Sequence, residues 1–159
     1  MQLVFTQLKM TLASELIEDA YKKISEGNYD DAITKLSTIL KRNEKTDTDN
    51  SSANQFNARY GLAICYFMRF MHSQNESENL NDSIINAGIA NSIFENHFDI
   101  HLILGQSYAA KFRIAGDAHY RTEAFSEYQK AKDLAGERPA FDKSDIEKKI
   151  DVLIEELLN

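Results

Sequence analysis

The segment Leu62-Ala63-Ile64-Cys65-Tyr66 returns 42 positions later as Leu104-Gly105-Gln106-Ser107-Tyr108. The stretch that follows each copy repeats as well: Ser83-x-x-x-Ala87-x-x-Ala90 returns 41 positions later as Ala124-x-x-x-Tyr128-x-x-Ala131. Self-similarity at a period of roughly 20–50 residues is typical of stacked repeats, in which each unit buries its apolar face against the next. A recurring pair of helices therefore decides the fold.

Outward from these copies, apolar residues recur at helical spacing along most of the chain. The spacing predicts helices over 12–26, 29–42, 52–72, 81–93, 98–114, 119–134 and 141–158. Gly27-Asn28 and Gly116-Asp117 supply left-handed turn residues, and Ser52-x-x-Gln55 and Ser144-x-x-Glu147 read as capping boxes. Short turns make consecutive helices antiparallel. We expect one all-α domain: an extension over 1–11, helix pairs over 12–43, 52–93 and 97–135, and a capping helix over 141–158.

The composition describes an acidic chain that can bury a core without disulfides. The 159 residues carry 18 Lys and Arg against 25 Asp and Glu, a formal net charge of −7. A chain of this length removes about 68–70% of its unfolded surface from water, so one domain is expected. The missing basic footprint argues against nucleic-acid binding, and the longest uncharged apolar stretch, 60–68, is too short to span a bilayer.

Two further observations concern the compartment. The single Cys65 has no partner within the chain, and its neighbours Ile64 and Tyr66 predict a buried thiol. Residues 1–10 show only Leu3-Val4-Phe5 as an apolar region, with no basic residue before it, which does not fit a secretory signal. We therefore expect a cytoplasmic protein.

The repeated positions resemble the tetratricopeptide repeat family, whose units carry an aromatic residue, then Leu-Gly and Tyr on the first helix, and Ala with an aromatic on the second. The resemblance covers about residues 12 to 139. The later units are longer than usual, because 20 residues separate Ala63 from Ser83 where 12 separate Ala20 from Ala32. About seven extra residues are two helical turns, so the buried faces keep their phase. Units of this length are similar to those of kinesin light chains and of spindle-orientation adaptors of the family.

The resemblance implies that the first helix of each pair lines the concave face of a right-handed superhelix. The family's groove columns fall here on Ile17, Tyr21, Asn57, Tyr60, Ile64, Phe67, Met68, Asp99, Leu102, Gln106, Ala109 and Ala110. This apolar and aromatic lining suits an amphipathic helix or an extended hydrophobic segment of another protein. Four cations on the same helices would form a rim that selects acidic flanks, namely Arg59, Arg69, Lys111 and Arg113. The same apolar residues are also explained as the core of long helices, and both interpretations stay open.

We therefore expect a protein-binding adaptor or scaffold that needs no cofactor and performs no catalysis. The combination of Lys, Asn and Arg with which some family members clamp a chaperone's terminal carboxylate is missing from these columns. One alternative is a type III secretion chaperone of the second class, which resembles this chain in size and acidity but has shorter units. Another is a self-assembling homo-oligomeric scaffold, in which the groove or Leu3, Val4, Phe5 and Leu8 would pair with another copy.

A metal-dependent enzyme is the remaining alternative, with His97, Asp99 and His101 as its cluster. Two His residues four positions apart share one helical face and suit zinc. However, Phe98 stands where a metalloprotease has Glu, no third ligand is evident, and His101 falls on the family's aromatic column, so packing is the simpler interpretation. Cys65 has no basic neighbour that would activate it as a nucleophile.

Overall fold

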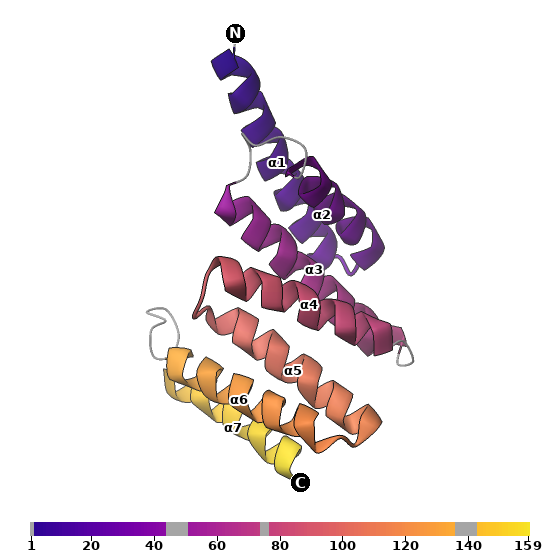
Figure 1. Cartoon of the computed structure of the whole chain (residues 1–159), viewed down its shortest axis with the longest axis vertical. Helices are drawn as coiled ribbons and strands as arrows, with labels where there is room; N and C mark the ends of the chain where they lie inside the picture. The colour runs from indigo at the N-terminus through magenta and orange to yellow at the C-terminus, as the bar shows by residue number, and fades with distance from the viewer. Residues whose placement is uncertain (1, 44–50, 74–76, 136–142) are drawn as a thin grey trace.

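The computed structural model describes residues 2–43, 51–73, 77–135 and 143–159, and within the first range it describes side chains for 13–42. These residues form seven helices and no strand (Figure 1). The helices are α1 (Gln2–Ser25), α2 (Tyr29–Asn43), α3 (Ser52–Ser73), α4 (Ser77–Ile93), α5 (Phe98–Ala115), α6 (Ala118–Ala135) and α7 (Lys143–Leu158). None of them is long and apolar enough to cross a membrane.

The helices pack in the order of the sequence. α1 packs on α2, α3 on α4 and α5 on α6, and α7 covers α6. Neighbouring hairpins join through α2 with α3 and α4 with α5, and the first helices also meet, α1 with α3 and α3 with α5. Figure 1 shows the hairpins stacked along the long axis, with the two ends of the chain at opposite ends of the stack. The predicted all-α array of three helix pairs plus a capping helix is confirmed.

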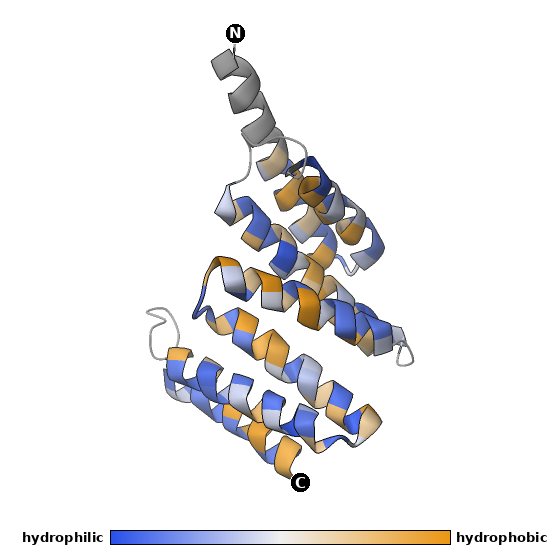
Figure 2. Ribbon diagram, in the orientation of Figure 1, coloured by the Kyte–Doolittle hydropathy of each residue, from blue (hydrophilic) through white to orange (hydrophobic). Residues whose placement is uncertain are grey.

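Each hydrophobic core lies where one hairpin meets the next element. The first core consists of Ile17, Ala20, Ala32, Leu36, Ile39, Ala58, Leu62 and Cys65. The second consists of Phe56, Ala63, Ala87, Ala90, Ile100, Ile103 and Leu104, and the third of Phe98, Ala109, Ala124, Tyr128, Ala131, Ala135, Ile150, Ile154 and Leu157. Figure 2 shows hydrophobic and hydrophilic residues mixed along the coloured part of each helix. Each unit thus buries its apolar face only against its neighbours, as in other repeat proteins.

Small residues allow close helix contacts at the repeated positions. Ala20 and Ala63 are fully buried, and a Cβ on Gly105 would lie 2.5 Å from Cδ1 of Tyr128. The aromatic residue that fills the space beside Gly105 is therefore Tyr128 of α6. Cys65 is fully buried as predicted, and burial raises the pKa of its thiol to about 12.

The helix ends confirm the turn glycines and correct the caps. Gly27 and Gly116 have φ of 76° and 68°, and the Gly116 N–H donates to Phe112 O at 2.8 Å. The cap of α3 is Ser51, whose Oγ accepts from the Asn54 N–H at 3.1 Å, and not Ser52, which lies inside the helix. α7 begins at Lys143, so Ser144 also lies within its helix.

Two boundaries differ from the sequence expectation. α1 starts at Gln2, so 2–11 belong to the first helix and not to a separate extension. α4 starts at Ser77, four residues before position 81, and part of the expected polar turn is helical. The side chains of Leu3, Val4, Phe5 and Leu8 lie outside the described residues, as do 44–50 and 136–142.

Candidate functional site

One face of α3 carries five of the twelve predicted groove residues. Asn57, Tyr60, Ile64, Phe67 and Met68 are all half-buried, while the opposite sides of the helix face the first and second cores. Tyr60, Ile64 and Phe67 pack against the second core with one edge and leave the other exposed. The sequence prediction that these residues share a helical face agrees with this burial pattern.

Met71 extends the same face and was missed. It lies four residues after Phe67 and three after Met68, so it shares their face, and it is 53% exposed. The helical spacing alone was sufficient to find it. We call Tyr60, Ile64, Phe67, Met68 and Met71 the α3 strip.

α1 borders the α3 strip through Tyr21. The Tyr21 Oη–H donates to the backbone O of Asn57 at 2.9 Å, which links the two first helices. Burial raises the pKa of this phenol well above its ordinary value, with smaller contributions from Tyr60 and Cys65. Ile17, by contrast, is 9% exposed and belongs to the first core, so it contributes packing and not surface. α1 also carries exposed polar side chains, including Glu18 and Lys22.

α5 lies on the other side of α3, and its predicted groove residues include the polar Asp99 and Gln106. Asp99 and Gln106 are half-buried, while Leu102 packs against the third core. Ala109 and Ala110 are buried, so they offer little surface to a partner. The apolar part of the predicted groove is therefore narrow, because it lies on α3 between two polar borders.

The four predicted rim cations each contact a neighbouring helix. Arg59 Nη1 donates to Asn86 Oδ1 of α4 at 3.0 Å, and Arg69 Nε lies 3.5 Å from Asp30 Oδ1 of α2. Lys111 Nζ donates to Asn81 Oδ1 of α4 at 2.6 Å, and it also lies 4.4 Å from the ring centroid of Tyr120.

Arg113 completes this set, since its Nη2 lies 3.7 Å from Glu156 Oε2 of α7. Both members of that pair are more than half exposed, so the pair adds little to stability. All four cations thus bridge adjacent helices, which is a structural role that the sequence did not reveal.

The residues of the suggested metal cluster do not converge. His101 is 4% exposed, and its Nδ1 lies 2.6 Å from Oε2 of Glu127. The second carboxylate oxygen of Glu127 accepts from Lys130 Nζ at 2.7 Å. His97 Nδ1 lies 3.8 Å from Asp99 Oδ2, away from this pair. Within the described ranges no three His, Cys, Asp or Glu side chains are placed to hold a metal ion, so the interpretation of His97, Asp99 and His101 as one ligand set is wrong.

An aromatic cluster that the sequence did not predict lies at the turn between α4 and α5. Phe56 is its centre, with ring centroids at 5.2 Å from Phe94, 5.1 Å from His97 and 6.2 Å from Tyr60. Phe56 is 7% exposed whereas Phe94 is 43% exposed. Because Tyr60 also belongs to the α3 strip, the cluster continues the strip toward the N-terminal end of α5. We call Phe56, Tyr60, Phe94 and His97 the aromatic cluster.

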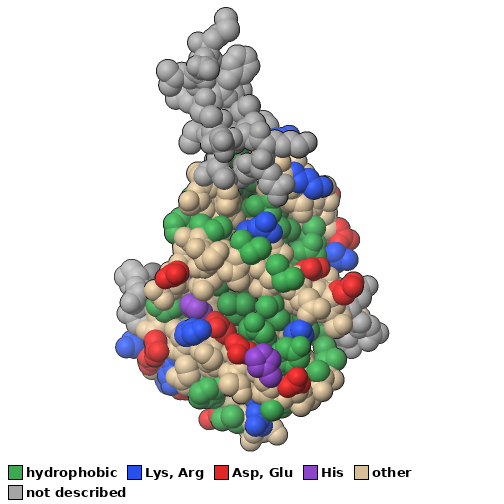
Figure 3. All heavy atoms as spheres, viewed as in Figure 1, with side chains coloured by type: hydrophobic (Ala, Val, Ile, Leu, Met, Phe, Trp, Pro, Cys, Tyr) green, Lys and Arg blue, Asp and Glu red, His purple; other side chains and the backbone are tan. Residues whose placement is uncertain are grey.

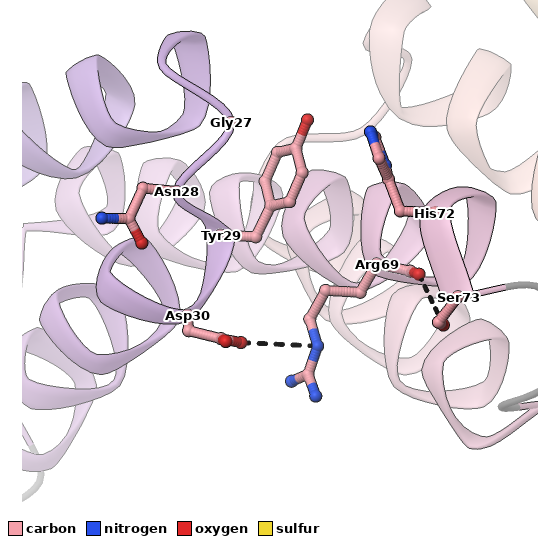
Figure 4. A pocket seen from close by; sticks show the side chains of 7 residues that line it. All are labelled: Gly27, Asn28, Tyr29, Asp30, Arg69, His72 and Ser73. Carbon is pink, nitrogen blue, oxygen red and sulfur yellow. Dashed lines mark hydrogen bonds and ion pairs between the residues drawn. The ribbon is translucent and has the colours of Figure 1, made fainter.

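A hollow of about 320 Å³ lies where the turn between α1 and α2 meets the end of α3. It is lined by Gly27, Asn28, Tyr29, Asp30, Arg69, His72 and Ser73. Figure 4 shows Tyr29 and His72 facing each other across it, with Arg69 turned toward Asp30. Because Arg69 and Asp30 pair, the hollow carries little net charge from this pair.

Exposed large apolar side chains are spread over several helices. Those among the described residues are Met71, Ile85, Phe94, Ile114, Phe125, Val152 and Leu158. Figure 3 shows hydrophobic side chains gathered near the middle of the viewed face, with acidic, basic and His side chains around them.

No protein-family model, curated protein or solved structure matches this chain.

Proposed function

We propose that this chain is a tetratricopeptide-like adaptor or scaffold that holds a segment of another protein along the α3 strip. The observation that carries the proposal is the strip itself: apolar side chains at 60, 64, 67, 68 and 71, half-buried or exposed on one helix face. Apolar groups that a fold leaves together on its surface are typical of binding sites.

The dimensions of the strip limit what can bind. From Tyr60 to Met71 the helix rises about 17 Å, which matches three turns of a bound helix or about five extended residues. The neighbouring helices α1 and α5 carry polar residues, with Glu18 and Lys22 exposed on α1 and Asp99 and Gln106 half-buried on α5. A segment with one narrow apolar edge and polar sides fits this arrangement better than a segment that is apolar all round, so we propose an amphipathic helix.

Met71→Glu tests the proposal without disturbing a core. Met71 is 53% exposed, so the variant is expected to fold, and far-UV circular dichroism and the urea midpoint would check this. Losing one buried Met side chain from an interface weakens binding by roughly tenfold or more. Partners are captured from a native extract on the immobilised chain, and the affinity of each captured partner is then measured with the purified protein.

Val152→Glu is the matched control, because Val152 is also 53% exposed but lies on α7. The proposal expects the control to bind its partner like the wild type and Met71→Glu to bind much more weakly. Equal affinities of the two variants for the captured partner, or no capture by the wild type, would contradict it. The double variant Met71→Glu/Phe67→Glu extends the test to a half-buried position.

A self-assembling scaffold is the second candidate, because α4 exposes Ile85 by 56% and a Cβ on the neighbouring Gly88 would meet no atom within 4 Å. Light scattering after size exclusion distinguishes the two, since a monomer has a mass of 18.1 kDa. A larger mass that Ile85→Glu reduces to the monomer value would favour self-assembly.

A further inference from the structure

We propose that the aromatic cluster between α4 and α5 binds an organic cation, such as the ammonium or guanidinium group of a Lys or Arg on the segment held along α3. The role in a partner segment rests on the proposed function, whereas the cation site itself is argued from the geometry below.

The rings of the cluster are contiguous, and two of them are exposed, Phe94 by 43% and the His97 side chain by 41%. Phe56 is the buried floor, Phe94 packs edge-on against it at an interplanar angle of 61°, and Tyr60 stacks at 29°. His97 closes the group, with its centroid 5.1 Å from Phe56 and 6.3 Å from Tyr60. A cation within about 6 Å of several such centroids is attracted by the negative faces of the rings.

His97 has an orientation that suits this role. The His97 side chain is 41% exposed, yet its Nδ1 is buried and receives no hydrogen bond within the described part of the chain. The exposed part of the imidazole is therefore its remaining edge and face. The ring thus presents surface to a ligand instead of serving as a helix cap, and no side-chain cap bond is formed at this start of α5.

The charges at this turn favour a cation over an anion. Asp99 is 28% exposed and its Oδ2 lies 3.8 Å from His97 Nδ1, and Glu95 in the turn is exposed. The C-terminal end of α4 and the N-terminal end of α5 both lie at this turn. Because the partial charges of the two helix ends are opposite in sign and similar in size, they largely cancel. Arg59, a cation on the same stretch of α3, is directed to Asn86 of α4. Glu95 and Asp99 thus place two carboxylates at this turn, which favours a cation as the ligand.

Choline and 3,3-dimethylbutan-1-ol test the site in solution, because they have nearly the same shape and differ in charge. Nuclear magnetic resonance of the full chain follows the ring and amide signals of Phe94, His97 and Tyr60 during each titration. N-acetyl-lysine methylamide is the third probe and represents a Lys side chain. We expect both cations to shift these signals in a saturable way and the neutral alcohol to shift them at least fivefold less.

Phe94→Leu and Asp99→Asn identify the groups responsible. Phe94 is 43% exposed, so Phe94→Leu is expected to keep the fold and weaken choline binding at least threefold. Phe125→Leu is the matched control, because Phe125 is 40% exposed on α6; it should bind choline like the wild type. Asp99→Asn should weaken both cations and leave the alcohol unchanged.

Three outcomes would overturn the cation site: no saturable shift with either cation, equal shifts with choline and the alcohol, or unchanged choline binding in Phe94→Leu. These outcomes are independent of the α3 strip, which Met71→Glu tests by partner capture. A chain that binds choline but captures no partner refutes the adaptor proposal alone, and a chain that captures a partner but ignores choline refutes the cation site alone.

Discussion

Replacing Gly105 with Ala should destabilise the protein, whereas the same replacement at Gly88 should stabilise it. Both glycines lie inside helices, Gly105 in α5 and Gly88 in α4. In a helix interior Ala is more favourable than Gly by about 1 kcal/mol. Any difference between the two variants therefore reports what surrounds the added methyl group.

The two glycines differ in the space around the added methyl group. A Cβ at Gly88 meets no atom within 4 Å, so the full gain of about 1 kcal/mol is expected there. At Gly105 the Cβ would lie 2.5 Å and 2.6 Å from two ring carbons of Tyr128, whose ring is 1% exposed and packs in the third core. Because that ring has no free space to move into, the cost falls at the upper end of overpacking, about 3 kcal/mol. The net change is a loss of about 2 kcal/mol.

Urea denaturation followed by far-UV circular dichroism measures both changes in the free energy of unfolding. The two variants should differ by about 3 kcal/mol, which for a chain of this size corresponds to roughly 6–12 °C in the melting temperature. Gly61→Ala is expected to fall between the two, since its Cβ would lie 2.8 Å from a terminal methyl of Leu36 and 3.4 Å from Cε2 of Tyr21, which is less crowded than the Tyr128 ring at Gly105. Equal shifts for Gly105→Ala and Gly88→Ala would refute the close contact of α5 with α6.

Three further predictions concern buried polar groups and turns. His101→Leu or Glu127→Leu alone should lower the free energy of unfolding by about 2–4 kcal/mol, because each deprives a buried polar atom of its hydrogen bond. The double variant should lose much less. Strictly additive losses in urea denaturation would argue against the pair. Because burial raises the pKa of the Cys65 thiol from 9.0 to about 12, the neutral thiol is favoured in the folded state. The contribution of the neutral thiol to stability should be complete below pH 9 and lost as the pH rises toward 12. Urea denaturation at alkaline pH checks this expectation, because Cys65→Ala should lose the part of the pH dependence that comes from the thiol. Gly116→Ala should cost about 1–2 kcal/mol, since φ is 68° there although the Cβ meets no atom within 4 Å; an unchanged melting temperature would show that the turn adopts another conformation.

The paired architecture explains why the candidate surface lies on α3. Two sides of α3 pack in the first and second hydrophobic cores, and α3 also contacts α1 and α5. Only one narrow face of α3 is left outside these contacts. This face is apolar, whereas the corresponding faces of α1 and α5 are mostly polar. The aromatic cluster at one end of this face adds a chemically different patch, so a bound segment would meet apolar contacts along α3 and acidic and aromatic groups near α5.

Helix positions and pairing followed from the sequence, because both depend on local chemistry. Apolar spacing of about 3.6 residues fixes which face of a helix is buried, and the turn glycines Gly27 and Gly116 end their helices through φ values that other residues avoid. The recurrence of residues 62–66 at 104–108 was enough to predict a repeated pair of helices. The sequence also placed Tyr60, Ile64, Phe67 and Met68 on one face.

Only the tertiary structure decided which side chains meet across the chain. His101 reaches Glu127, Phe56 reaches Phe94, and Gly105 lies beneath Tyr128. Helical periodicity specifies the direction of each side chain on its own helix but not the crossing angle and offset between helices, and partner choice depends on both. For the same reason the four rim cations were predicted as free to meet a ligand, whereas each contacts a neighbouring helix.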